Sequence, residues 1–185
     1  MELNLKSPSI LFKKYLEDFP SLINIRWSDD TKTWTKKDLD YFRELAKAIG
    51  YDCYPDTEEY RGEYLVDLCW ENQAEWKHHW LELALEEEWN ENWDGIFWDF
   101  GKLTDIKAFI KVFICFQKEA ERSELPVALA RFVSQSGVKL PEEAYLVIVF
   151  SRNPRRKLSE RLQVEGFAID YRGELTKLGS QLFSD

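Results

Sequence analysis

The stretch Leu81-Glu82-Leu83-Ala84-Leu85-Glu86-Glu87-Glu88-Trp89 alternates apolar and polar residues and then carries three consecutive carboxylates. Alternation with a period of two is typical of a β-strand with one apolar face. Successive side chains of a strand point to opposite faces, so Glu86 and Glu88 share one face and Glu87 lies on the other. We therefore predict a strand over residues 80–89 that presents two carboxylates together near its end.

A second predicted strand, residues 64–71, contains one acid among apolar residues, in Tyr64-Leu65-Val66-Asp67-Leu68-Cys69-Trp70. Burying such an acid without a partner costs free energy. If the two strands are neighbours, Asp67 can lie about 5 Å from the acids across the ladder. Three carboxylates could then share one hard cation such as Mg²⁺, although acids at a strand end are also typical of a solvated tip.

The flanking sequence predicts further elements in a mixed order. A helix is predicted from Ser7-Pro8-Ser9 through Leu16, and a second from a cap at Thr35 to Gly50. The later predictions are a strand or loop over 51–60, a loop over 90–95, a helix from Asp99 to about Ala108, a buried strand over 109–116, a helix over 117–134 interrupted by Pro126, a buried strand over 144–151, and a hairpin around Arg172-Gly173 or a helical tail.

This order predicts the fold class. Early strands joined by short connections should be antiparallel, and later strands separated by helices should be parallel or mixed. We predict an α/β fold with a central mixed β-sheet flanked by helices.

Composition bounds the protein class. The chain has 185 residues, 44% hydrophobic, which is typical of one domain with a sizeable core. A net charge of -9 argues against non-specific coating of nucleic acid, because phosphate neutralisation supplies most of that affinity. Three cysteines without Cys-x-x-Cys spacing predict buried free thiols in a reducing, cytoplasmic compartment. No apolar run approaches the roughly 20 residues of a membrane-spanning helix.

Asp67, then Glu86-x-Glu88, then a helix and the buried strand 109–116, resembles the PD-(D/E)XK nuclease superfamily, the restriction-endonuclease-like proteins with an αβββαβ core. The resemblance covers roughly residues 36–151, within a single domain over 1–185 that adds an N-terminal helix and a C-terminal extension. It implies a nuclease-like protein that hydrolyses phosphodiester bonds of nucleic acid with Mg²⁺ or Mn²⁺.

Carried onto this chain, the resemblance makes Asp67 the first metal-binding acid and Glu86 the second, with Glu88 beside them. The family usually has a lysine where Glu88 stands, and some members carry it on the following helix instead. Lys102 is the best candidate for such a displaced lysine, and Lys107 is the second. Lys102 would stabilise the charge of the transition state.

Two further patterns are open to more than one interpretation. Residues 152–161 hold five basic residues against one acid, a local charge of +4, which predicts either a nucleic-acid-binding rim or a solvated loop. Its basic members are Arg152, Arg155, Arg156, Lys157 and Arg161. Five of the eight tryptophans fall between Trp76 and Trp98, where they could stack on bases, although core packing is the commoner role.

Two functions therefore follow from the sequence. The first is a metal-dependent nuclease-like enzyme with Asp67, Glu86, Glu88 and Lys102 at its site. The second is a non-catalytic binding protein on the same fold, whose acidic surface docks a basic partner. The oligomeric state stays open, a homodimer included.

Overall fold

The computed structural model of the chain describes residues 5, 7–26, 29–56, 66–72, 80–118, 123–137, 140–152 and 162–183. Within these ranges the helices are α1 (Pro8–Asp18), a π-helical turn η1 (Phe19–Ile23), α2 (Thr31–Ile49), α3 (Trp93–Asp105) and α4 (Glu124–Gln135). The strands are β1 (Asp52–Tyr54), β2 (Leu68–Glu71), β3 (Leu81–Glu88), β4 (Ala108–Phe116), β5 (Ala144–Arg152), β6 (Leu162–Asp170) and β7 (Leu175–Phe183).

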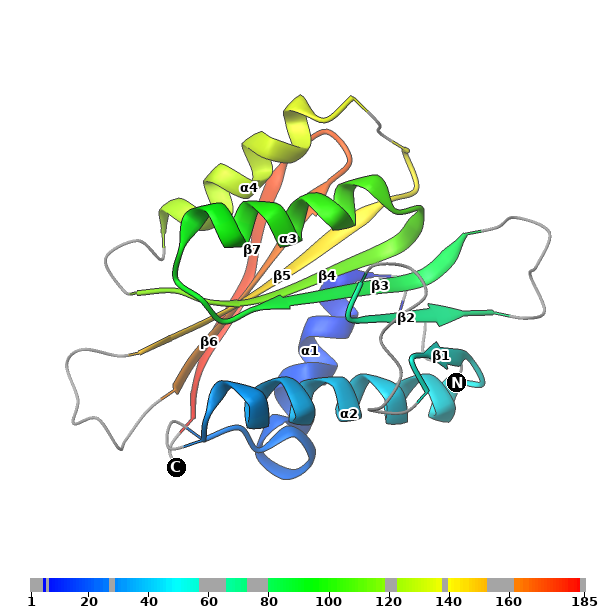
Figure 1. The fold of residues 1–185 in the computed structure, drawn as a ribbon, viewed down its shortest axis with the longest axis vertical. Helices are drawn as coiled ribbons and strands as arrows, with labels where there is room; N and C mark the ends of the chain where they lie inside the picture. Colours follow the sequence, from blue (N-terminus) through cyan, green and yellow to red (C-terminus); the bar gives the residue numbers. More distant parts are fainter. Residues whose placement is uncertain are drawn as a thin grey trace.

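The strands form one sheet in the order β1-β2-β3-β4-β5-β6-β7, so every strand pairs with its neighbours in sequence (Figure 1). The pairs β3–β4 and β4–β5 are parallel, and the other pairs are antiparallel. The parallel pairs are the ones joined by helices α3 and α4, because a parallel connection must return along the sheet. The prediction of an α/β fold with a central mixed sheet flanked by helices is confirmed.

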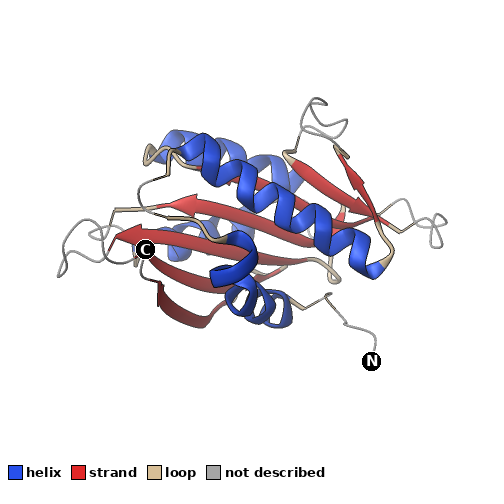
Figure 2. Ribbon diagram, turned by 90° about the horizontal axis from the view of Figure 1, so that it is seen from below, coloured by secondary structure: helices blue, strands red, loops and turns tan. Residues whose placement is uncertain are grey.

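The helices cover the two faces of the sheet separately. Figure 1 shows α3 and α4 on one face and α1 and α2 on the other, and Figure 2 shows α2 as the long helix on the face seen from below. Each face has its own apolar cluster: Phe42 and Phe150 belong to the α1–α2 side, and Phe100 and Phe113 belong to the α3–α4 side. The central strands are therefore buried on both faces, as the apolar run over 109–116 predicts.

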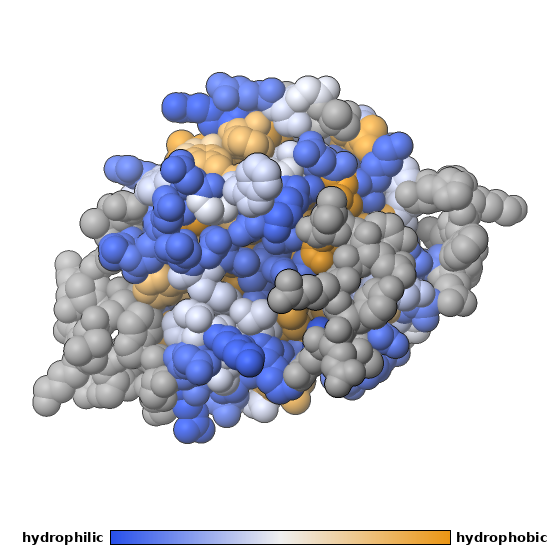
Figure 3. Space-filling model, viewed as in Figure 1, coloured by the Kyte–Doolittle hydropathy of each residue, from blue (hydrophilic) through white to orange (hydrophobic). Residues whose placement is uncertain are grey.

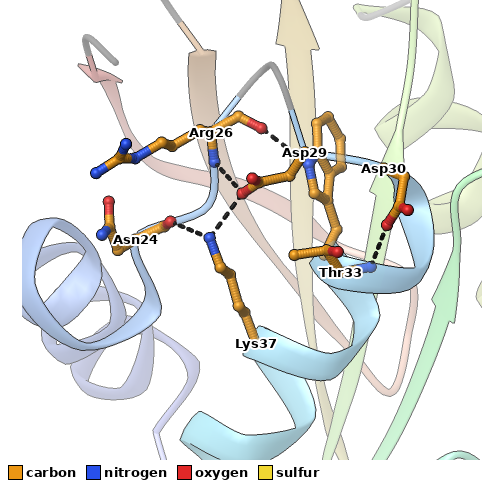
Figure 4. A network of polar contacts seen from close by, with 7 residues as sticks. Asn24, Arg26, Asp29, Asp30, Thr33 and Lys37 are labelled. Carbon is orange, nitrogen blue, oxygen red and sulfur yellow. Dashed lines mark hydrogen bonds and ion pairs between the residues drawn. The ribbon is translucent and has the colours of Figure 1, made fainter.

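The start of α2 differs from the prediction. The helix begins one turn earlier than a Thr35 cap would allow, because the Asp30 side chain accepts a hydrogen bond from the Thr33 N–H at 2.7 Å. Figure 4 shows the polar network that leads into this cap: Lys37 Nζ donates to Asn24 O and to Asp29 Oδ2, each at 2.6 Å. The network fixes the loop between η1 and α2. The predicted end at Gly50 is confirmed, with φ of 79° at that residue.

Two later helices also differ from their predicted bounds. Helix α3 begins at Trp93 behind an Asn92 cap, so Asp99 lies inside the helix and is not its cap. Helix α4 begins at Glu124, which puts Pro126 in the first turn, where the ring interrupts no helical hydrogen bond. The C-terminal segment forms the hairpin β6–β7, longer than predicted, and the helical alternative for the tail is wrong.

Three cysteines, Cys53, Cys69 and Cys115, are buried free thiols, as predicted. In the described part of the chain, no helix combines the length and the apolar composition that a membrane span requires.

Candidate functional site

The predicted site residues come from three elements that meet on the α3 side of the sheet. Glu86 and Glu88 stand near the end of β3, and Lys102 stands near the end of α3. Asp67 lies in a bend directly before β2, so its predicted position within a strand is wrong. The β2–β3 register pairs Leu68 with Leu85, which puts Asp67 one step beyond the last pair, next to Glu86.

Helix α3 brings Lys102 onto β3. Its Nζ lies 3.1 Å from Glu86 Oε2 and 2.6 Å from Asp99 Oδ1. The Glu86 side chain is buried, at 2% exposure, whereas 32% of the Lys102 side chain is exposed. The lysine therefore links a buried carboxylate to the surface of the molecule.

The second candidate lysine, Lys107, lies elsewhere. Its carbonyl oxygen accepts a hydrogen bond from the Leu81 N–H at 3.0 Å, at the beginning of β3. Glu86 stands five residues further along that strand, a separation of about 17 Å at the rise of a β-strand. The structure thus brings Lys102 and not Lys107 to the acids.

Asp67 and Glu88 are held by backbone N–H groups at the two ends of the site. Asp67 Oδ2 accepts from the Glu87 N–H at 2.8 Å, and Glu88 Oε1 accepts from the Asn90 N–H at 2.5 Å. A methyl group at Gly95 on α3 would stand 3.1 Å from Glu88 Oε2. The absence of a side chain at Gly95 therefore leaves room for the Glu88 carboxylate against the first turns of α3.

Asp99 is a site residue that the sequence did not single out. Its carboxylate contacts Lys102. Burial raises the pKa of Glu88, and the neighbouring Asp99 carboxylate raises it further. Asp99 and Lys102 are three residues apart on α3, a spacing that places them on the same helix surface. The sequence prediction treated Asp99 as the cap of the helix, so its pairing with Lys102 was not expected.

The electrostatics of the site follow from burial. Burial, followed by the charge of Asp67, raises the pKa of Glu86 to about 8, although Lys102 acts in the opposite direction. Burial also raises the pKa of Asp67, against the hydrogen bond from Glu87 and the charge of Lys102. Burial alone would lower the pKa of Lys102, but its contacts with Asp99 and Glu86 raise it overall. Lys102 is thus a permanent positive charge beside Glu86 and Asp67, two acids that bind protons more tightly than usual.

Glu87 points to the other face, as the alternation predicts. Burial and the charge of Asp38 on α2 raise its pKa well above the usual range. Tyr15 donates a hydrogen bond from its hydroxyl to Asp38 Oδ1 at 2.6 Å. Both oxygens of Glu87, and Asp38 Oδ2, are buried without a hydrogen-bond partner among the described residues.

The carboxylate oxygens of the site are ligands that a hard cation prefers. Glu86 Oε1 is buried and has no hydrogen-bond partner among the described residues, and Asp67 engages only Oδ2 in the described hydrogen bonds. Mg²⁺ commonly takes one or two protein carboxylates and completes its shell with water and phosphate. Asp67 and Glu86 fit that pattern. In the described ranges, no group of three His, Cys, Asp or Glu side chains has an arrangement for holding a metal, so Glu88 is not brought in as a third ligand.

Of the basic residues over 152–161 that were predicted to bind nucleic acid, the structure describes only the backbone of the first. Arg152 ends β5, and Arg155, Arg156 and Lys157 lie outside the described residues. Their role stays a prediction.

The tryptophans of residues 76–98 divide by environment. Trp89 packs against Trp34 and Phe150 and donates its Nε1–H to Thr35 Oγ1 at 2.8 Å, so it belongs to the core side of α2. Trp80 and Trp93 contact phenylalanine rings, and Trp76 lies outside the described residues. Trp98 on α3 is 75% exposed.

A comparison of the chain with family models, curated proteins and solved structures finds no match in any of the three.

Proposed function

We propose that this chain is a divalent-metal-dependent, nuclease-like protein of the PD-(D/E)XK type that hydrolyses phosphodiester bonds of nucleic acid. The observation that carries the proposal is the position of Lys102, whose Nζ lies 3.1 Å from Glu86 Oε2 although sixteen residues separate the two in sequence. The order α2-β1-β2-β3-α3-β4, helix, three strands, helix and strand, supports the αβββαβ core.

Each residue has a role that its surroundings support. Asp67 and Glu86 would hold Mg²⁺ or Mn²⁺, and such an ion, when bound, polarises a phosphodiester and lowers the pKa of a water molecule. Lys102 stays protonated because Asp99 and Glu86 raise its pKa, and it would offset the negative charge that develops on the phosphate oxygens. Asp99 orients the Lys102 ammonium group through the 2.6 Å contact.

Glu86 links cation binding to pH. Since its pKa is raised to about 8, Glu86 holds a proton at neutral pH in the absence of a cation. A carboxyl group must lose its proton to act as a ligand, so metal binding at this site would release a proton and would tighten between pH 6 and 8.

The test is cleavage of labelled single-stranded DNA, double-stranded DNA and RNA in Mg²⁺ or Mn²⁺ by the wild type and Glu86→Gln. We expect metal-dependent cleavage by the wild type and its loss in the variant. The matched control is Glu165→Gln on β6. Glu165 is equally buried and pairs with Lys177 at 2.6 Å, but it lies three strands from β3, about 14 Å across the sheet.

Cleavage that survives Glu86→Gln, or that both substitutions abolish equally, would overturn the assignment of the site. Absence of cleavage by the wild type on all three substrates would remove the catalytic claim.

The second candidate is a non-catalytic protein that docks a basic partner through its acidic surface. The net charge of -9, and the glutamate at the position where the family usually has lysine, favour it. Isothermal titration with Mn²⁺ separates the two functions. A site that binds Mn²⁺ in the wild type and not in Glu86→Gln supports the enzyme, and a site that binds no ion supports the docking protein.

A further inference from the structure

Helix α3 exposes one large aromatic ring beside the candidate site. Trp98 is 75% exposed, more than any other large hydrophobic side chain in the described ranges. The other exposed members of that group are aliphatic: Ile10, Leu22, Val127 and Leu182. Trp98 therefore contributes little to the core, and its ring is available to a ligand.

Trp98 lies one helical turn before Lys102. Residues four apart on a helix are surface neighbours, with about 5–6 Å between their Cβ atoms. Lys102 reaches from that surface to Glu86, while Asp99, the residue after Trp98, also contacts Lys102. The exposed ring thus flanks the outer rim of the carboxylate–lysine site.

The charge of this rim limits the kinds of nucleic acid that it can hold. Affinity for duplex DNA comes mainly from lysine and arginine side chains that neutralise phosphates. Here the one described lysine at the rim, Lys102, already contacts two carboxylates, and Asp94 lies one turn before Trp98. Phosphates repel this rim in single strands and duplexes alike, but a base stacked on an aromatic ring adds about 1–3 kcal/mol, and only an unpaired base can reach the ring.

The surroundings of Trp98 favour a base over an apolar protein partner. The exposed large hydrophobic side chains of the described ranges are scattered, one each from α1, η1, α3, α4 and β7. Figure 3 shows hydrophilic residues over much of the face in view, with hydrophobic patches between them, some in the upper part where α3 and α4 lie. Protein-interaction sites are usually marked by larger contiguous apolar patches. A single exposed ring beside a polar site is better suited to a planar base.

We propose that Trp98 stacks on an unpaired base and makes single-stranded nucleic acid the substrate class of the site. This inference rests on the proposed function for its meaning in catalysis, but the stacking itself can be measured without cleavage.

The experiment measures binding of a fluorescein-labelled twelve-nucleotide single strand and of the matching duplex by anisotropy, in EDTA. The full chain is used as wild type, Trp98→Ala, Trp98→Phe and the control Leu22→Ala. Leu22 is 66% exposed and belongs to η1, on the opposite face of the sheet from α3. We expect the single strand to bind more tightly than the duplex, and Trp98→Ala to weaken it by about 5- to 150-fold, the equivalent of one stacked base. Trp98→Phe should retain part of the affinity, and Leu22→Ala should retain all of it.

Equal affinity of the wild type and Trp98→Ala would overturn the inference, as would equal or tighter binding of the duplex, or no binding by the wild type. The salt dependence of binding should be the same in the wild type and Trp98→Ala, because a stacked ring neutralises no phosphate, and a shallower slope in the variant would overturn the inference. If Trp98-dependent binding persists but the wild type cleaves nothing, the proposed function fails and the stacking site stands. If the wild type cleaves and Trp98→Ala binds and cleaves like it, only the stacking inference fails.

Discussion

Carboxylates gather against both faces of strand β3, and the surroundings of the two groups differ. The site cluster, on the α3 side, consists of Asp67, Glu86, Glu88 and Asp99 with Lys102. The buried cluster, on the α1–α2 side, consists of Glu87 and Asp38 with Tyr15. The site cluster includes a partly exposed lysine. In the buried cluster, no described cation acts on the pKa of either acid, and burial raises both pKa values.

The two clusters differ in their access to a cation and to solvent, while burial raises the pKa of acids in both. Glu86 and Glu87 are adjacent in sequence and both are nearly inaccessible to solvent. Glu86 has a charged partner, Lys102, whose side chain is partly exposed. After burial, the charges of Asp38 and Asp67 raise the pKa of Glu87, so the free energy of unfolding depends on the proton that Glu87 and Asp38 retain.

The largest expected effect is on the cleavage rate, which should depend on the site cluster and not on the buried cluster. Lys102→Met should lower the single-turnover rate of cleavage by at least about 100-fold, a typical loss when a preorganised charge is removed from a transition state. The free energy of unfolding should change by only about 1 kcal/mol, because the ammonium group is partly solvated. Rapid-quench kinetics and urea unfolding measure the two quantities.

Lys177→Met is the matched control, because Lys177 pairs with the buried Glu165 in a similar way, away from β3. It should leave the rate of cleavage unchanged. A rate in Lys102→Met within a few fold of the wild type would mean that Lys102 only offsets the charge of Glu86. The site cluster would then have no more part in cleavage than the buried cluster has.

The second effect concerns stability and pH in the buried cluster. Burial raises the pKa of Asp38 from 3.8 to about 8, so the folded chain keeps a proton that the unfolded chain releases between these values. This group therefore lowers stability progressively as pH rises through that window. Asp38→Asn removes the titration and should reduce the fall in the free energy of unfolding between pH 5 and 8, by an amount on the order of a few kcal/mol. Urea unfolding across this range measures it.

Asp170→Asn provides the control for this titration. Burial acts to raise the pKa of Asp170, but hydrogen bonds from Glu174 and Arg172 lower it overall, so Asp170 is ionised in both states above pH 5. Its substitution should leave the slope between pH 5 and 8 unchanged. Parallel pH profiles for Asp38→Asn and the wild type would show that Asp38 is ionised in the folded chain.

The strands were predictable because their signals are local. The alternation in residues 81–88 and the apolar run in 108–116 depend only on the residues themselves, and the separation of Glu86 from Glu87 follows from the same alternation. The place of Asp67 was not predictable in the same way. It leaves the strand to accept a hydrogen bond from Glu87, and that bond exists only once β2 and β3 are paired.

The start of α3 was missed because Asn90 to Gly95 has the composition of a loop. Gly95 is unfavourable inside a helix by local propensity, yet at this position a larger residue would crowd Glu88. Because the predicted helix began too late, Asp99 was taken as its cap and not as an interior residue, and its pairing with Lys102 was not expected. The choice of Lys102 over Lys107 needed the pairing of Leu81 with residue 107, which no local pattern reveals.

The third effect tests how tightly the α1–α2 side is packed. A methyl group at Gly166 on β6 would overlap the ring of Phe12 on α1. Gly166→Ala should therefore lower the free energy of unfolding by about 1–3 kcal/mol, as overpacking of a dense core usually does. Urea unfolding measures the change, and the double variant Gly166→Ala with Phe12→Leu should recover part of it. Wild-type stability in Gly166→Ala would show that α1 moves freely against the sheet.

The smallest effect tests the same substitution at the site cluster. In Gly95→Ala the new methyl group would stand 3.1 Å from Glu88 Oε2, the end of a flexible side chain. The higher helix propensity of alanine, about 1 kcal/mol, should offset this crowding, so the free energy of unfolding should change by less than about 1 kcal/mol. The shifted Glu88 carboxylate would disturb its contact with Asp99, and the cleavage rate should fall by only a few fold, since Lys102 stays against Glu86. Rapid-quench kinetics and urea unfolding again measure both. A loss of stability as large as that of Gly166→Ala would mean that Glu88 is held as rigidly as the core, and the contrast between an adaptable site face and a tightly packed opposite face would then be lost.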